Sequence, residues 1–154
     1  MRKKMNDKGF TLVELIVVLV ILAILAAILV PALLGYIDRA RNQQYVLNAK
    51  SWLTATQAEF SAMYGAGKKP ATDLDATRKT RIKETADCDC TSFSVEVGAA
   101  GGTNDHGLWT VKQASYAYEP TDGGKKIYLE FDGTEWIEKT ETSFTKKTIK
   151  ILGN

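Results

Sequence analysis

One ionisable side chain lies at the start of a segment that is otherwise apolar. Glu14 is followed by twenty residues, Leu15 to Leu34, that carry no charge. A charge inside a membrane helix costs about 2.5–3.5 kcal/mol on insertion scales, so Glu14 requires a cationic partner or a position within reach of lipid headgroups. The apolar run contains no lysine or arginine to serve as that partner on the same helix face. A free α-amino group at Phe10 would supply the positive charge, and cleavage after Gly9 would create it.

The other residues that could do chemistry are few. Cys88 and Cys90 are two positions apart, so a disulfide between them is possible, but it would close a very small loop and stabilise the fold little. His106 is the only histidine, and no spacing around it is typical of a metal site. The sequence has neither a nucleophile elbow nor a phosphate-binding loop. We therefore expect no enzyme, with no catalytic residues, no metal and no cofactor.

The apolar segment determines the class of protein. Twenty helical residues span about 30 Å, which is the thickness of the hydrocarbon core of a bilayer. A surface of this kind must be covered by lipid, or by helices of other copies or partners. Four basic residues precede it, at positions 2, 3, 4 and 8, which predicts a cytoplasmic N-terminus. The alternative is a removed secretory signal, but this run is longer than such signals and continues into a polar helical pattern, which favours an anchor.

The residues around Glu14 resemble the N-terminus of type IV prepilins. A short basic leader ends at Gly9, Phe10 follows it, Glu14 is the fifth residue from Phe10, and the apolar run ends near Pro31. This resemblance covers Met1 to about Arg41, and the remainder of the chain agrees only in length and layout. Pseudopilins of type II secretion and competence systems share the same N-terminal features.

The resemblance implies a processing pathway and a set of partners. A membrane-embedded prepilin peptidase would cut between Gly9 and Phe10 and methylate the new amine of Phe10. In the assembled filament, Glu14 would pair with the Phe10 amine of an adjacent subunit, because an unpaired carboxylate in an apolar bundle is strongly disfavoured. An assembly ATPase and a membrane platform protein would supply the work, since the chain has no ATP motif.

The helix is predicted to continue well beyond the apolar run. From residue 36 to residue 64 the pattern becomes amphipathic, with apolar residues near helical spacing. Gly65-Ala66-Gly67 is a stop signal for this helix. Pro31 removes one helical hydrogen bond and Gly35 weakens the next turn, so we expect a kink between Ala27 and Gly35.

The rest of the chain predicts a small head of α+β architecture, in which the second half of the helix covers one face of an antiparallel sheet. We expect an irregular polar segment from 68 to 85. Strands are then expected at 93–97, 108–112, 115–119, 126–131, 135–139 and 143–152, with turns at 122–124 and 132–133. The expected divisions are a cleaved leader (1–9), a transmembrane and filament-core helix (10–35), its amphipathic continuation (36–64) and the head (65–154).

Charge argues against a nucleic-acid-binding head. Lys and Arg number 20 and Asp and Glu 18 in the whole chain, and removal of residues 1–9 changes the net charge from +2 to −1. Residues 65–154 hold 13 basic and 14 acidic side chains. The best basic group is formed by Arg78, Lys79, Arg81 and Lys83, and we interpret it as a solvated loop.

These observations predict a structural subunit of a type IV pilus. Before assembly it would be a single-pass membrane protein surrounded by lipid, and afterwards part of an extracellular homopolymer for adhesion, motility or DNA uptake. The nearest alternative is a pseudopilin, and a less favoured one is a membrane-anchored head that binds a ligand.

Overall fold

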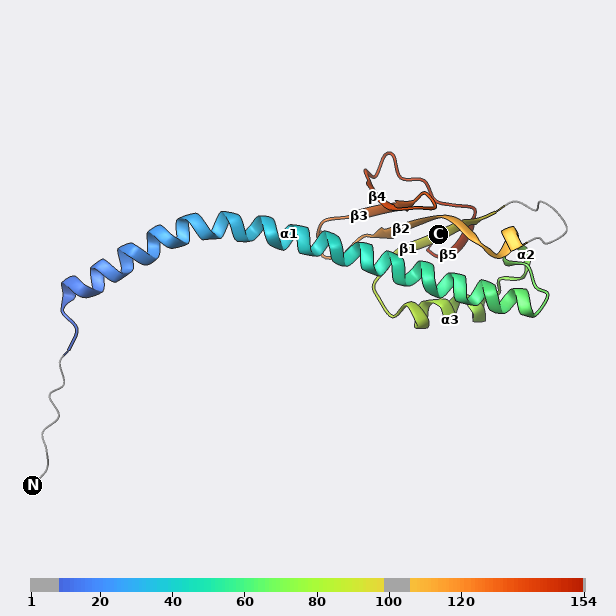
Figure 1. Cartoon of the computed structure of the whole chain (residues 1–154), viewed down its shortest axis with the longest axis horizontal. Coiled ribbons are helices and arrows are strands. Elements are labelled where there is room, and N and C mark those ends of the chain that lie inside the picture. Colours follow the sequence, from blue (N-terminus) through green and yellow to red (C-terminus); the bar gives the residue numbers. More distant parts are fainter. Residues whose placement is uncertain (1–8, 99–105, 154) are drawn as a thin grey trace, which may run out of the picture. The chain divides into compact units, whose positions relative to one another are not determined.

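The computed structural model describes residues 9–98 and 106–153, and the remaining positions, including Met1 to Lys8 of the expected leader, lie outside the described residues. Contacts between residues divide the chain into two compact units, 1–42 and 43–154. The elements, labelled in Figure 1, are α1 (Leu12–Gly65), α2 (Pro70–Asp73), α3 (Ala76–Ala86), β1 (Ser92–Val97), the 3₁₀ helix η1 (His106–Trp109), β2 (Val111–Tyr118), β3 (Ile127–Phe131), β4 (Trp136–Lys139) and β5 (Ile149–Leu152). The α+β class predicted from the sequence is confirmed.

Helix α1 ends where the glycines predict a stop. Gly67 has a φ of +67°, a conformation that glycine adopts without steric cost. The Lys68 N–H donates to the Met63 carbonyl at 2.9 Å, which closes a C-terminal capping loop. At the weak point expected between Ala27 and Gly35, helical structure continues through Pro31 and Gly35.

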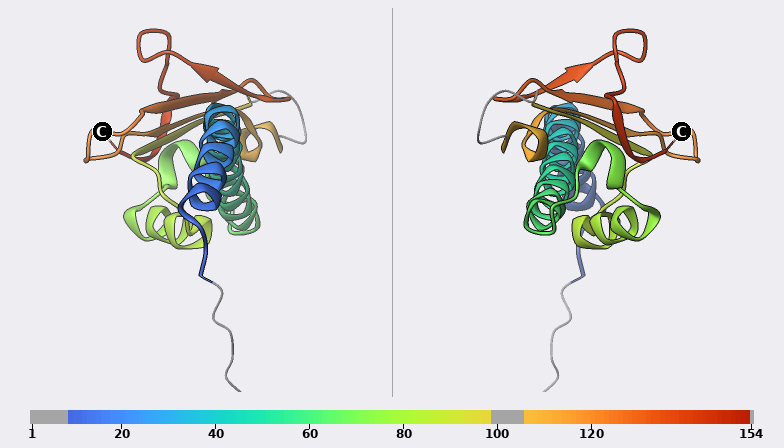
Figure 2. Two further views of the ribbon diagram at one scale, coloured as in Figure 1. Left: turned by 90° about the vertical axis from the view of Figure 1, so that its left-hand side faces the viewer. Right: turned by 90° about the vertical axis from the view of Figure 1, so that its right-hand side faces the viewer.

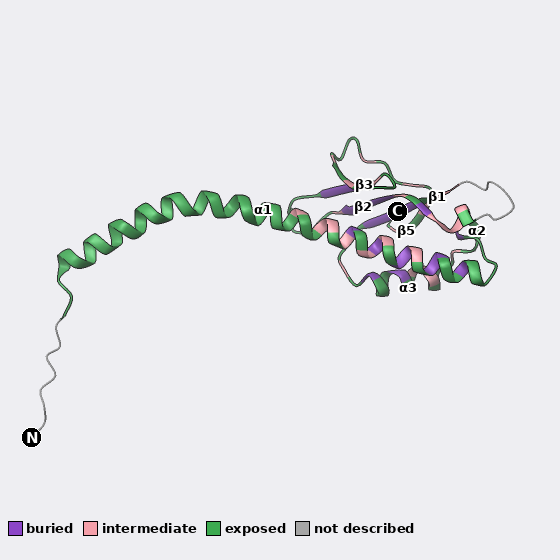
Figure 3. Ribbon diagram, viewed as in Figure 1, coloured by how far each residue is buried: buried purple, intermediate pink, exposed green. Residues whose placement is uncertain are grey.

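The second half of α1 buries one stripe of side chains against the sheet, which Figure 3 shows as alternating buried and exposed segments. The stripe includes Ala49, Trp52, Ala55, Phe60 and Met63, all at most 4% exposed. The Trp52 ring lies 5.5 Å from the ring of Phe93 on β1, and its indole N–H donates to the Cys88 carbonyl. This face is the amphipathic continuation that the sequence predicts.

The five strands form one antiparallel sheet in the order β4-β3-β2-β1-β5. The expected strands near 93–97, 126–131 and 135–139 are confirmed as β1, β3 and β4. The expectation of a strand at 108–112 was wrong over most of its length, because His106–Trp109 forms η1 and β2 begins at Val111. Only Ile149–Leu152 of the expected strand 143–152 pairs with the sheet, and it pairs with β1.

The expectation of an irregular segment from 68 to 85 was also wrong, because this region contains helix α3. Asp75 accepts a hydrogen bond from the Arg78 N–H at 2.9 Å and so caps the helix N-terminus. Ile82 and Ala86, four residues apart, are buried in the core. Alanine, lysine, arginine and glutamate favour helix on their own, so the signal was present in the composition.

The segment before β5 is attached to the sheet by two buried hydroxyl groups. Ser94 on β1 and Ser115 on β2 are opposite each other, and their Oγ atoms lie 2.6 Å apart. The Lys147 N–H donates to Ser94 Oγ at 2.8 Å. Both serines are 1% exposed, so these hydroxyls satisfy polar groups that water does not reach.

We expect Ser94→Ala to lower the free energy of unfolding by about 1–3 kcal/mol, because it removes the closer acceptor of the Lys147 N–H and leaves only the longer contact to Ser115 Oγ at 3.4 Å. Thermal or urea unfolding of the full chain in detergent would measure this. Ser61→Ala is the matched control, since Ser61 is an exposed helical serine whose hydroxyl donates to the Gln57 carbonyl. An equal loss in the two variants would contradict the prediction.

Candidate processing and assembly site

The first turn of α1 is closed by three reciprocal hydrogen bonds between Thr11 and Glu14. Glu14 Oε2 accepts from the Thr11 N–H at 2.9 Å and from Thr11 Oγ1 at 2.7 Å. In return, the Glu14 N–H donates to Thr11 Oγ1 at 3.3 Å. This is a capping box, in which the residue before the helix and the third helical residue satisfy each other's backbone donors. Thr11 had no role predicted from the sequence, although the Thr-x-x-Glu spacing is the signal for a capping box.

The position of Glu14 in the first turn also suits its charge. The N-terminus of a helix carries a partial positive charge, which favours an acidic side chain there. Both hydrogen bonds from Thr11 reach the same carboxylate oxygen. Among the described residues, the second oxygen, Oε1, has no hydrogen-bond partner, so it is open to a further donor.

The bond between Gly9 and Phe10 lies just outside the helix and is unobstructed by the described residues. A Cβ placed on Gly9 would meet nothing within 4 Å beyond its chain neighbours. The Phe10 side chain is 85% exposed. A protease that binds an extended backbone at this bond therefore has room to approach it.

The helix after this site presents an apolar surface on every side. All residues from Leu12 to Leu34 are exposed, and the helix is long and apolar enough to cross a membrane by length and composition. The apolar large side chains in this run leave roughly half or more of their surface uncovered. An exposed apolar area of this extent requires lipid or other helices to cover it.

Comparison with known families identifies this segment. Residues 4–30 carry the prokaryotic N-terminal methylation motif, the class III signal peptide of type IV pilins. The motif supports a type IV pilin or pseudopilin precursor and a structural role rather than an enzymatic one. Together with the apolar helix, it fits a membrane-anchored pilin precursor. No curated protein and no solved structure matches the chain significantly.

The candidate residues of the head do not come together in one site. Cys88 and Cys90 are free, and their Sγ atoms lie near different carbonyls, those of Asn48 and Ala117. Burial raises the pKa of Cys90 to about 12, so this thiol stays protonated at neutral pH. Both thiols are free in this structure, so no disulfide links Cys88 to Cys90 here.

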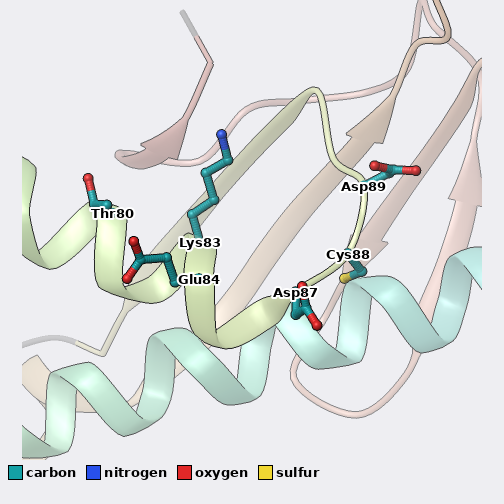
Figure 4. A pocket seen from close by; sticks show the side chains of 6 residues that line it. All are labelled: Thr80, Lys83, Glu84, Asp87, Cys88 and Asp89. Atoms are coloured by element: carbon teal, nitrogen blue, oxygen red, sulfur yellow. The ribbon is translucent and has the colours of Figure 1, made fainter.

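The other candidate residues of the head are also separated. His106 begins η1, and its ring lies 5.0 Å from that of Tyr64. Among the described residues, no group of His, Cys, Asp and Glu side chains is arranged to hold a metal ion. Figure 4 shows the cleft beside Cys88, where the carboxylates of Glu84, Asp87 and Asp89 point in different directions.

The basic group at 78–83 belongs to α3 and is partly buried, which corrects its interpretation as a solvated loop. Arg78 Nη1 lies 2.5 Å from Glu59 Oε1 on α1, and Arg81 Nη1 lies 3.5 Å from Glu59 Oε2. The Arg78 side chain is only 14% exposed. Arg78 therefore connects α3 to the second half of α1 and is not available to bind a ligand.

Proposed function

We propose that this chain is the structural subunit of a type IV pilus, released from its leader between Gly9 and Phe10 by a prepilin peptidase. The observation that carries the proposal is the methylation motif at the start of an exposed apolar helix. Processed subunits would be held in the membrane by residues 10–35. They would then enter a filament whose core is a bundle of the same helices. Transfer from lipid to this bundle replaces one apolar environment by another, so the helix is never exposed to water.

Glu14 would set the axial register of each incoming subunit. Its Oε2 is engaged by Thr11, whereas Oε1 has no partner among the described residues and could accept from the Phe10 amine of a neighbour. The capping box would hold the carboxylate in one orientation at the surface of the helix. A charge-assisted hydrogen bond to an amine is stronger than one between neutral groups, so a subunit in the wrong register would lose more than a packing contact.

The processing step is tested directly by mass spectrometry of the chain from surface filaments. We expect a mature N-terminus at Phe10 that bears one methyl group on its amine. The peptidase, the assembly ATPase and the platform protein are the partners that this pathway requires. Filaments built from chains that still begin at Met1 would contradict the proposal.

The length of the filament separates a pilus from a pseudopilus, since both begin with this motif. Long surface fibres composed mainly of this chain, seen by electron microscopy and identified by their peptides, are expected for a major pilin. Their absence from cells that contain the processed chain would favour a pseudopilin.

A further inference from the structure

Charged side chains of the second unit are divided between the two edges of the sheet. Residues 68–86 and 146–150, which include all of α3, together carry nine Lys and Arg against three acidic residues, Asp73, Asp75 and Glu84. Residues 119–141 carry three Lys against seven Asp and Glu. The basic segments include β5, and the acidic segment includes β4, which are the outer strands on opposite sides of the sheet. The near-neutral total of the head therefore conceals two surfaces of opposite charge.

The basic edge consists of α3 and β5 with the residues beside them. Both views in Figure 2 place α3 on the same side as the chain end that follows β5. A cleft of about 280 Å³ is lined by Lys79 of α3 and Lys150 of β5, with no acidic residue in its lining. Within the described part of the chain, neither of these two lysines forms an ion pair.

Three carboxylates at or beside the basic edge are already engaged, those of Asp73, Asp75 and Glu59. Asp73 accepts from the Lys69 N–H at 2.7 Å, and Asp75 accepts from the Arg78 N–H. Glu59 binds Arg78 and Arg81. Glu84 of α3 is exposed, and in the described structure neither it nor the three engaged carboxylates forms an ion pair with Lys79 or Lys150. The two ammonium groups are therefore free to meet charges from outside.

The acidic edge consists of β4 and the turn that precedes it. Lys125 and Lys126 pair with Glu138 and Glu141 in exposed contacts of 3.3 and 3.1 Å. In the region that the structure describes, Asp132 and Glu135 are exposed and have no cationic partner. Hydrogen bonds from Thr134 and Glu135 lower the pKa of Asp132 to about 2, so this carboxylate is charged at any physiological pH.

We propose that the basic edge of one subunit docks against the acidic edge of a second copy of this chain in the filament. The inference rests on the proposed polymeric function and adds the contact between heads. The two surfaces differ, so the contact is heterologous and repeats along an open assembly. Because they lie at opposite edges of the sheet, one subunit engages a neighbour on each side at the same time. Complementary charge of this kind fixes orientation and excludes incorrect pairings, since like charges brought together repel.

The experiment compares charge reversals at each edge with their combination, in cells that express the full chain. Lys79→Glu with Lys150→Glu changes the basic edge, and Glu135→Lys with Glu138→Lys changes the acidic edge. Each pair is expected to lower the yield of sheared filaments about tenfold or more, and the four changes together to restore it to within about twofold of wild type. Lys112→Glu, on the central strand β2, is the control for a single charge reversal and is expected to assemble normally.

Any other outcome contradicts the docking of the basic edge against the acidic edge. Normal yield from either edge variant would show that the edge is not used, and failure of the combined variant to recover would show that the edges do not meet each other. If the basic-edge variant assembles normally but loses binding to duplex DNA that the wild type shows, the surface serves a polyanion.

Equal thermal unfolding of all variants in detergent excludes misfolding as the cause of a lower filament yield. Absence of filaments from wild-type cells would refute the proposed polymer itself. This result needs no variant, so it is distinguishable from failure of the docking between the two edges.

Discussion

Glu14→Gln should abolish filaments while leaving cleavage and methylation at Phe10 intact. Glutamine can occupy the third position of a capping box, so the helix start is retained and only the charge is lost. The amine of the neighbouring Phe10 would then be buried in an apolar bundle without a counter-charge. Removing one partner of a buried ion pair costs about 3–5 kcal/mol, which corresponds to a loss of roughly a hundredfold or more in assembly. The amount of sheared filament relative to processed chain in the membrane measures the effect.

Thr11→Val is the matched control, because it removes the capping box and keeps the charge. Losing a cap costs about 1 kcal/mol, so filament yield should fall only severalfold. If Thr11→Val and Glu14→Gln reduced assembly equally, the cap rather than the charge would carry the effect. Normal filaments from Glu14→Gln would contradict the pairing of Glu14 with the amine.

The features that were predictable from the sequence are those encoded locally. The length and apolar character of the first half of α1, the motif around Gly9 and the stop at Gly67 each depend on a few neighbouring residues. Strands β3 and β4 were found for a similar reason, because glycines with positive φ at 123 and 133 mark the turns before them. In these segments the local preference and the final structure agree.

The features that were missed depend on contacts between distant segments. Helix α3 was taken for a loop because its charged residues suggested solvent, whereas Arg78 lies against Glu59, nineteen positions earlier. The separate strand predicted at 108–112 was wrong over most of its length, because the sequence does not reveal Gln57 as a partner of this segment. Its side-chain amide accepts from the Val111 N–H and donates to the Trp109 carbonyl, which holds η1 and β2 to α1. A charged or amide side chain shows its role only when its partner is known.

The ion pair between α1 and α3 should be the most sensitive polar contact of the head. Glu59 is 7% exposed and faces two guanidinium groups, of which that of Arg78 is itself largely buried. Glu59→Gln would leave the Arg78 guanidinium in the core without a counter-charge. We expect the free energy of unfolding to fall by about 3–5 kcal/mol, measured by urea unfolding of the full chain in detergent. Glu138→Gln is the control, since its pair with Lys125 is exposed and should contribute at most about 1 kcal/mol.

A second variant separates the loss of attraction from the cost of an isolated charge. Glu59→Leu combined with Arg78→Met removes both charges and keeps apolar volume between α1 and α3. Because a buried pair is expensive to desolvate, the combined variant should recover most of the stability that Glu59→Gln loses. Arg78 favours this outcome, since its Nε is buried and has no partner in the described structure. A combined variant less stable than Glu59→Gln would show instead that the pair contributes net stability, and that α3 is held to α1 mainly by charge rather than by Ile82 and Ala86.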